Sequence, residues 1–268
     1  MAKTATQPVA LTVAGSDSGG GAGAQADLKT FAAHGVHGTS AITCLTAQNP
    51  SAVTAVQPTR VDMLRAQLRA VFDGLRPDAI KTGMLFSNPL VRCVSDFLAG
   101  LESPRPPLVV DPVMVSTSGA QLLKPAAIRA VKQDLLPLAT LITPNLDEAS
   151  LLLDQPVRTV PEARDAARIL AERHGCSVLV KGGHREGISE AVDVLWHHGH
   201  ATLLRSPWIP GAATHGTGCT LSAAITAQLA LGRPLGSAVR RAKDYITQAI
   251  GEGYRAGAHE HLRHLPRR

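Results

Sequence analysis

The sequence predicts an α/β fold with a mostly parallel sheet, and two observations support that prediction. Short apolar runs bounded by turn residues recur along the chain, and segments with helical spacing separate many of them. This alternation is typical of parallel sheets whose two faces are both covered by helices. Such sheets bind ligands beyond the carboxyl ends of their strands, so we expect functional residues where strands end.

The first elements follow this alternation. An apolar strand over 9–15 precedes a glycine-rich loop and a helix over 24–35, which ends at a glycine. The next apolar stretch covers 39–47. Four short buried strands are then predicted, over 78–83, 107–112, 140–145 and 177–183.

Two further helices and a hairpin complete the predicted elements. Residues 59–72 have helical spacing, and Thr59 with Asp62 matches the spacing of a capping box. Residues 161–175 form an amphipathic pattern with proline at its start and glycine at its end. Residues 191–207 read as two strands around a short turn, so the sheet is expected to include an antiparallel hairpin.

The composition predicts one domain over 1–268, with a basic C-terminal tail over about 256–268 that we expect to be disordered. The four cysteines lie far apart, which favours a reducing compartment, and no apolar run approaches the roughly 18 residues of a membrane span. We therefore expect a cytoplasmic protein with no membrane partner. The net charge of +6 suits an anionic small molecule, and with aromatic residues at 3% we expect no nucleic acid partner.

The first glycine-rich loop allows more than one interpretation. Gly21, Gly23 and Ala26 match the form of a dinucleotide-binding fingerprint between a strand and a helix. That fingerprint requires an acidic residue about 20 residues further on, but the chain has none between Asp27 and Asp62. A dinucleotide-dependent oxidoreductase is therefore a weaker alternative. A tight turn that brings the helix close to the sheet is the other interpretation.

The second glycine-rich loop leads directly into a predicted helix over about 218–231. Backbone N–H groups at such a helix start form an anion site, so Gly216 and Gly218 could hold a transferring phosphoryl group. Cys219 lies at the same helix start, where the helix field is expected to lower its pKa and let it act on a substrate hydroxyl. The alternative is that Cys219 is a small buried apolar residue, as the other cysteines are.

Polar residues follow several of the predicted strands, and together they suit phosphoryl transfer. Asp111 and Glu148 could hold Mg²⁺ through water, since Mg²⁺ takes few direct protein ligands. Lys181 could neutralise phosphate charge. Structural roles compete with these functions, because Asn145 and Glu148 also match a helix capping box and Asp111 precedes a proline in a turn.

Seven segments, in this order over nearly the whole chain, resemble one family. They are AGSDSGGGAGAQADLKTF, TAQN, KTGML, DPVM, TPNLDEA, VKGGH and HGTGCTLSAAI. They are similar to the hydroxymethylpyrimidine/phosphomethylpyrimidine kinases of thiamin biosynthesis, within the ribokinase-like superfamily. The resemblance implies a three-layer α/β/α fold, a homodimer, and ATP and Mg²⁺ as cofactors.

The resemblance also implies two successive phosphorylations. The first acceptor is the alcohol of 4-amino-5-hydroxymethyl-2-methylpyrimidine, and the second is its monophosphate. The motif matches place the pyrimidine against Gly15, Asp27, Gln48 and Met84. A buried amide such as that of Gln48 pairs with an aminopyrimidine edge and penalises analogues that lack this edge.

The remaining expected roles concern ATP and the reacting groups. We expect Asn145, Lys181 and Thr217 to contact ATP. We also expect Cys219 to orient or deprotonate the hydroxymethyl group, with Asp111 beside it in the catalytic site.

The chain departs from the family at three places. Ser18-Gly19 stands where members often have Pro-Ser, and the glycine is expected to loosen that loop. Ala213 stands where many have Asn, and Thr46 stands where an apolar residue is frequent, which could alter the pocket wall.

Two other functions compete with the pyrimidine kinase. A pyridoxal or pyridoxine kinase on the same fold would also phosphorylate a hydroxymethyl group on an aromatic ring. A non-catalytic pyrimidine-binding module would bind the acceptor without forming ADP, but the presence of both Asp111 and Cys219 disfavours it.

Overall fold

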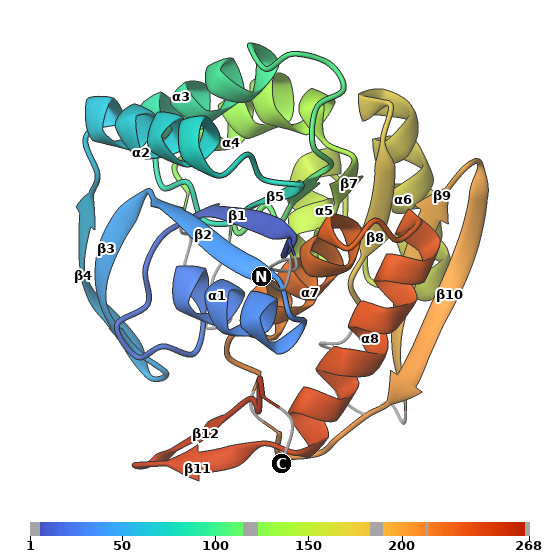
Figure 1. The fold of residues 1–268 in the computed structure, drawn as a ribbon. Coiled ribbons are helices and arrows are strands. Elements are labelled where there is room, and N and C mark those ends of the chain that lie inside the picture. The colour runs from blue at the N-terminus through green and yellow to red at the C-terminus, as the bar shows by residue number, and fades with distance from the viewer. Residues whose placement is uncertain (1–5, 115–122, 183–189, 213, 266–268) are drawn as a thin grey trace.

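An eight-stranded sheet forms the centre of the computed structural model, which describes residues 6–114, 123–182, 190–212 and 214–265 (Figure 1). The strand order across the sheet is β10-β9-β8-β7-β6-β5-β1-β2. Six strands are parallel: β1 (Val9–Ala14), β2 (His37–Ile42), β5 (Ala79–Thr82), β6 (Leu108–Val110), β7 (Leu141–Ile142) and β8 (Ser177–Val180). The expected parallel sheet is confirmed.

The predicted antiparallel hairpin closes one edge of this sheet. Its strands are β9 (Glu190–His197) and β10 (His200–Pro207), and β9 also pairs antiparallel with β8. The turn between them contains Gly199, whose φ of 77° lies in the left-handed region that glycine adopts at little cost.

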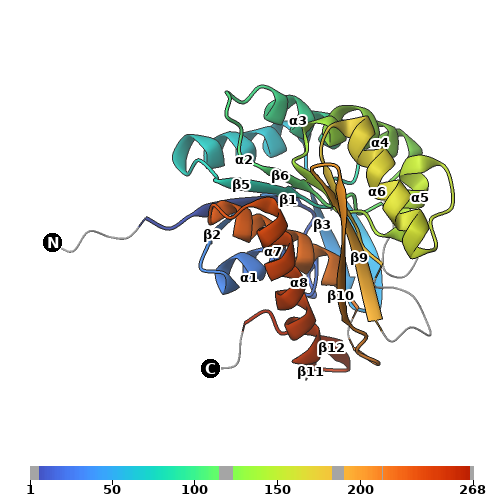
Figure 2. The ribbon, with the colours of Figure 1, turned by 90° about the vertical axis from the view of Figure 1, so that its right-hand side faces the viewer.

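Helices cover both faces of the sheet, which gives the expected α/β/α layers (Figure 2). One layer contains α1 (Gly23–Ala33), α7 (Thr217–Ala230) and α8 (Leu235–Gly251). The other contains α2 (Val61–Gly74), α3 (Asn88–Ala99), α4 (Pro125–Ala130), α5 (Leu146–Leu153) and α6 (Val160–His174), with a π-helical segment (Val131–Leu135) and a 3-10 turn (Leu136–Leu138) after α4. Among the described helices, none is long and apolar enough to cross a bilayer.

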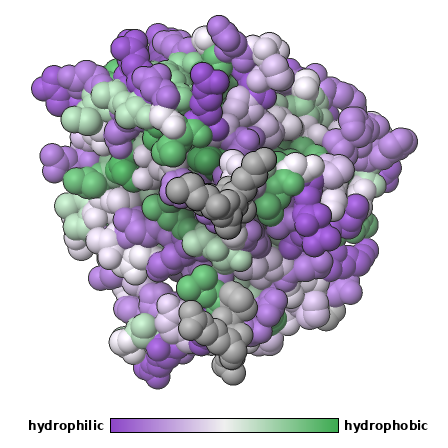
Figure 3. Space-filling view, viewed as in Figure 1, coloured by the Kyte–Doolittle hydropathy of each residue, from purple (hydrophilic) through white to green (hydrophobic). Residues whose placement is uncertain are grey.

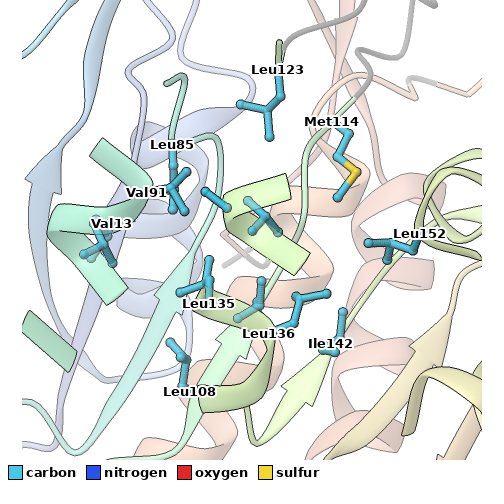
Figure 4. Packing of buried hydrophobic residues seen from close by; sticks show 14 of the residues in the cluster. Val13, Leu85, Val91, Leu108, Met114, Leu123, Leu135, Leu136, Ile142 and Leu152 are labelled. Atoms are coloured by element: carbon cyan, nitrogen blue, oxygen red, sulfur yellow. The ribbon is translucent and has the colours of Figure 1, made fainter. Parts of the chain in front are cut away.

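Alternating strand residues divide the core between the two layers. Val110 and Ile142 pack with the α2 to α6 layer, in the cluster drawn in Figure 4. Val109, Leu141 and Leu179 pack with α7 and α8. This division follows from the two-residue repeat of a strand, which sends successive side chains to opposite faces of the sheet.

The apolar stretch over 39–47 forms two strands. It is divided between β2 and β3 (Cys44–Asn49), and β3 pairs with β4 (Ala52–Pro58) in a separate two-stranded sheet. Thr43 lies at the break, where its hydroxyl donates to the Met84 carbonyl at 2.7 Å. This tertiary contact turns the chain away from the main sheet.

The C-terminal tail is structured where the model describes it, so the expectation of disorder was wrong there. Residues 254–261 form a hairpin of β11 (Tyr254–Ala256) and β12 (His259–His261). His264 is buried, and its Nε2 lies 3.1 Å from the Thr220 hydroxyl on α7. A hydrogen bond and burial therefore hold the tail against the first turns of α7.

One of the two predicted helix capping boxes is confirmed, and the other was wrong. Asn145 and Glu148 form the predicted capping box at the start of α5. Helix α2 instead begins after Arg60, and the side chain of Thr59 makes no capping bond. Asp62, which was expected to complete that box, pairs with the Arg60 guanidinium at 2.8 Å.

Candidate active site

The predicted functional residues after β6 and β8 meet at the carboxyl edge of the sheet. Asp111 follows β6, and one of its carboxylate oxygens accepts a hydrogen bond from Lys181 Nζ at 2.8 Å. The other oxygen accepts from the Ser222 hydroxyl, on α7, at 3.1 Å. These contacts join the two strand ends to the helix that carries Cys219.

The Asp111 carboxylate stays ionised in this setting. Burial raises the pKa of Asp111, but the Lys181 and Lys81 ammonium groups and the hydrogen bonds from Lys181 and Ser222 outweigh burial. The pKa of Asp111 therefore lies below its ordinary value. The edge of the sheet holds a fixed negative charge between two cations.

A second buried ion pair lies beside the first. Lys81 Nζ lies 2.7 Å and 2.8 Å from the two carboxylate oxygens of Asp27, and both side chains are 0% exposed. Burial alone would lower the pKa of Lys81, but the carboxylate of Asp27 and the nearby Asp111 and Cys219 raise it above its ordinary value. Sequence reasoning did not identify this pair, because nothing in the sequence indicates that Lys81 has a partner 54 residues away.

The side chain of Asp27 is therefore already engaged. It accepts from Lys81 and, at 2.6 Å, from the Thr12 hydroxyl. A contact between Asp27 and the pyrimidine stays a prediction, and a ligand N–H group would have to donate to a carboxylate that already accepts these bonds.

The two glycine-rich loops pack directly against each other. Gly216 precedes α7 with φ of 81°, and a Cβ built on it would collide with the Gly21 carbonyl oxygen. A Cβ on Gly218 would lie 3.5 Å from Lys181 Nζ and 3.8 Å from the Asp111 carboxylate. Glycine at 216 thus allows the two loops to approach closely. Glycine at 218 leaves space beside the Asp111–Lys181 pair.

Cys219 lies in the first turn of α7, as expected, but its thiol is not activated there. Burial raises the pKa of Cys219 to about 11, and the Asp27 and Asp111 carboxylates add to this. Lys81 and the Gly23 N–H group act in the opposite direction and are outweighed. The expected lowering of its pKa was wrong, because desolvation and the two buried carboxylates together exceed the effects of Lys81 and the Gly23 N–H group.

Glu148 is held by backbone groups. Its two carboxylate oxygens accept from Met114 N at 3.1 Å and Asn145 N at 2.9 Å. Between Asp111 and Met114 lies Val113, whose φ of 43° is strained for a β-branched residue. Glu148 therefore braces the turn that follows Asp111, and Asn145 keeps its amide nitrogen without a bonding partner among the described residues.

Two buried carboxylates, those of Asp111 and Glu148, are the predicted Mg²⁺ ligands. Among the described residues, no group of three or more His, Cys, Asp and Glu side chains could hold a metal ion. Asp111 and Glu148 are both buried near Lys181. The pKa of Asp111 lies below its ordinary value, whereas burial and the Asp111 charge raise the pKa of Glu148 despite the charge of Lys181. This donor set fits an ion that keeps most of its waters and takes few protein ligands.

Two of the residues expected around the pyrimidine, Gly15 and Met84, lie side by side. A Cβ on Gly15 would lie 2.7 Å from Cys44 Sγ and 2.8 Å from Met84 Cε, so glycine is required for this packing. Gln48 is half-buried on β3, and its side-chain amide has no bonding partner among the described residues. An amide left unpaired in this way is available to a ligand.

Asp17 is a site residue that sequence reasoning missed. It accepts from the backbone N–H groups of Gly19, Gly21 and Ala22 at 2.8 to 3.1 Å, and it contacts His215 Nε2 at 3.0 Å. Burial raises the pKa of Asp17, but the contact with His215 and the backbone bonds outweigh it and leave the pKa below its ordinary value. An aspartate directly ahead of a glycine-rich turn is the signal that could have identified it.

Two of the three positions where this chain departs from the family pattern make hydrogen bonds between the first loop and β3. The Ser18 hydroxyl donates to the Gln48 carbonyl at 2.6 Å and accepts from the Gln48 N–H at 2.7 Å. The Thr46 hydroxyl donates to the Ser16 carbonyl at 2.8 Å. The loosening expected from Gly19 stays a prediction, and Ala213 lies outside the described residues.

Comparisons with known proteins identify the family of the chain. The family model described as phosphomethylpyrimidine kinase matches residues 17–264. A hydroxymethylpyrimidine/phosphomethylpyrimidine kinase of Synechococcus elongatus is 47% identical over 91% of each chain, and one of Haemophilus influenzae is 47% identical over 92% of each chain.

A solved structure extends the comparison to three dimensions. An ADP complex of Bacillus subtilis pyridoxal kinase has a TM-score of 0.89 and 39% identity, and the match covers 97% of this chain and 98% of that one. The fold is therefore ribokinase-like as expected, and a dinucleotide-dependent oxidoreductase is not supported. With its paired buried charges beside a glycine-rich helix start, the chain belongs to the phosphomethylpyrimidine kinase family.

Proposed function

We propose that this protein phosphorylates 4-amino-5-hydroxymethyl-2-methylpyrimidine with ATP, and then phosphorylates the monophosphate to the diphosphate, in cytoplasmic thiamin biosynthesis. The observation that supports this most is the Asp111–Lys181 pair, with 2.8 Å between its charged atoms, beside the glycine-rich start of α7. Phosphoryl transfer requires this combination of fixed cations, backbone donors and space for a phosphate.

The transfer step uses the start of α7. The acceptor oxygen forms a bond to the γ-phosphorus of ATP as the bond from that phosphorus to the β,γ-bridging oxygen breaks. ADP leaves, and the proton of the acceptor hydroxyl passes to water. The backbone N–H groups from Gly216 to Gly218 stabilise the charge on the transferring group, and Lys181 neutralises it further. Asn145 and Thr217 contact ATP at the same edge.

Cys219 orients the acceptor hydroxyl in this mechanism. Since burial raises its pKa to about 11, the group is a neutral thiol near pH 7 before substrate binds. A thiol can hold the acceptor hydroxyl in line for attack on the γ-phosphorus. Correct orientation alone raises the rate of transfer by a large factor, and the thiol does not need to remove the hydroxyl proton beforehand.

Mg²⁺ would be held by Asp111 and Glu148 through water. When bound, the ion would neutralise charge on the β- and γ-phosphate oxygens. The residues themselves contribute fixed positions, since Asp111 is held by Lys181 and Ser222 and Glu148 by backbone N–H groups.

The acceptor ring lies against Gly15 and Met84, with Gln48 reading its aminopyrimidine edge. The unpaired amide of Gln48 supports this placement. The Asp27 carboxylate contacts the ring from the interior of the protein, where it is paired with Lys81.

We also propose that two copies of the chain form a dimer through the β3–β4 hairpin and α2. The hairpin exposes Leu45, Val53 and Val56, and α2 exposes Met63. Figure 3 shows apolar residues among polar ones on the left-hand side, where Figure 1 places this hairpin. Light scattering during size exclusion should give twice the chain mass, and Val56→Asp should give the mass of one chain.

Release of ADP from Mg·ATP tests the acceptor. The hydroxymethylpyrimidine, its monophosphate and pyridoxal are compared in parallel at equal concentrations. Turnover on both pyrimidines, with little on pyridoxal, is the expected result. Preference for pyridoxal would favour the second candidate, which the structural similarity to a pyridoxal kinase supports. No ADP with any acceptor would favour a non-catalytic binding module.

A further inference from the structure

The Asp17 carboxylate is the point where the two glycine-rich loops are joined. Three backbone N–H groups of its own loop and His215 Nε2 converge on its two oxygens. His215 is 198 residues away in the chain and directly precedes Gly216. The side chain of Asp17 is 1% exposed and that of His215 is 20% exposed, so little water competes for the contact.

Packing around the pair leaves little freedom in the relative position of the loops. A Cβ on Gly21 would lie 2.8 Å from His215 Cδ2, and a Cβ on Gly216 would collide with the Gly21 carbonyl oxygen. The His215 ring thus rests on the first loop beside the residue that begins α7. A shift of His215 would carry Gly216 with it.

The same first loop also holds the expected acceptor side of the site. Ser18 bonds both backbone groups of Gln48, and Ser16 bonds both the N–H and the hydroxyl of Thr46. The loop over 16–22 therefore contacts β3 on one side and the start of α7, through Asp17, on the other. The position of this loop therefore determines the distance between the acceptor bound near β3 and the phosphoryl group held at the start of α7.

We propose that the Asp17–His215 contact positions the start of α7 against the first loop, and that phosphoryl transfer depends on this contact. The proposal rests on the proposed roles of Gly216 to Gly218 in holding the transferring group and of Cys219 in orienting the acceptor. Asp17 and His215 are positioning residues, because they act through the backbone between Gly216 and Cys219. A displacement of that backbone by about 1 Å can reduce turnover about a hundredfold.

His215→Phe and His215→Gln are the two variants that test the contact. Phenylalanine keeps a ring against Gly21 but has no N–H group, whereas glutamine keeps an N–H donor at a similar reach. For H215F we expect kcat to fall about tenfold to a hundredfold, with the KM for the pyrimidine changed by less than about threefold. H215Q should recover most of the lost kcat.

The double variant distinguishes a shared contact from two separate effects. If Asp17 and His215 act through each other, D17N/H215F should lose no more kcat than the worse single variant. Multiplied losses, an H215F enzyme with full kcat, or a loss confined to KM would overturn the proposal. Thermal unfolding of each variant reports whether it is folded, and His215→Leu replaces H215F if that variant is not.

Gly218→Ala separates this inference from the proposed function. An alanine there would place a methyl group 3.5 Å from Lys181 Nζ, in the space assigned to phosphate. If G218A keeps full turnover, the assigned role of the loop fails. If G218A is impaired and H215F is not, only the positioning role of Asp17 and His215 fails.

Discussion

Two groups of ion pairs in this molecule have nearly the same lengths and opposite surroundings. Lys81–Asp27 at the carboxyl edge of the sheet measures 2.7 Å with both side chains 0% exposed. Arg60–Asp62 at the start of α2 measures 2.8 Å with side chains 84% and 66% exposed. The distance alone therefore says nothing about what each pair contributes.

The difference lies in what happens when one partner is removed. At the surface, water solvates the remaining charge, and such pairs contribute little to stability. In the interior, the remaining charge has no solvent and destabilises the fold strongly. Buried pairs of this kind fix charges in place, which suits a site that must stabilise a phosphoryl group.

Lys81→Met should have the largest effect on stability. It leaves the Asp27 carboxylate buried with only the Thr12 hydroxyl, and the free energy of unfolding should fall by about 3–5 kcal/mol. Denaturant unfolding measures this change. The double variant K81M/D27N should recover part of the loss, whereas a loss below about 1 kcal/mol in K81M would contradict the importance of the pair.

Asp111→Asn should mainly reduce catalysis. The substitution keeps the shape of the side chain but removes the charge that holds Lys181, and we expect kcat to fall about a hundredfold or more. ADP release with the hydroxymethylpyrimidine measures the effect. Full turnover in a folded D111N enzyme would remove Asp111 from the catalytic site.

The alkylation of Cys219 should depend on pH in a way that reports the buried charges. Its pKa is raised from 9.0 to about 11, so the thiol form is favoured in the folded protein. The stability that this contributes is present below pH 9.0 and is lost as the pH rises through about 11. Iodoacetamide should label Cys219 slowly at pH 8 and faster toward pH 11, as read by peptide mass spectrometry. A labelling midpoint at or below pH 9.0 would contradict this prediction.

Arg60→Ala should have the smallest effect. Both partners of this pair are exposed, so neither the unfolding midpoint in denaturant nor kcat should change measurably. This variant also serves as the surface control for K81M. A clear loss of stability in R60A would break the contrast between the two groups of pairs.

Local patterns predicted the strands and the residues that follow them, because apolar runs and turn residues are adjacent in sequence. The Asn145–Glu148 cap was predictable for the same reason, since its partners are three residues apart. The Lys81–Asp27 and Asp17–His215 contacts were not, because they join segments 54 and 198 residues apart. The pKa of Cys219 could not be predicted either, since it depends on burial and on carboxylates that only the fold brings close.

The position of β3 and the C-terminal hairpin also required tertiary information. Residues 39–47 read as one apolar stretch, and the contact of Thr43 with Met84 divides it. The tail reads as polar and basic, yet His264 is buried against α7. In both cases a long-range contact overrides the local pattern.

The most direct test compares the ADP release of Lys181→Met with that of Arg60→Ala, using Mg·ATP and the hydroxymethylpyrimidine. If the buried charges at the sheet edge form the phosphoryl-transfer site, K181M should lose about a hundredfold or more in kcat while R60A matches the wild type. Equal activity of the two variants, with both folded, would contradict the assignment of this edge as the active site.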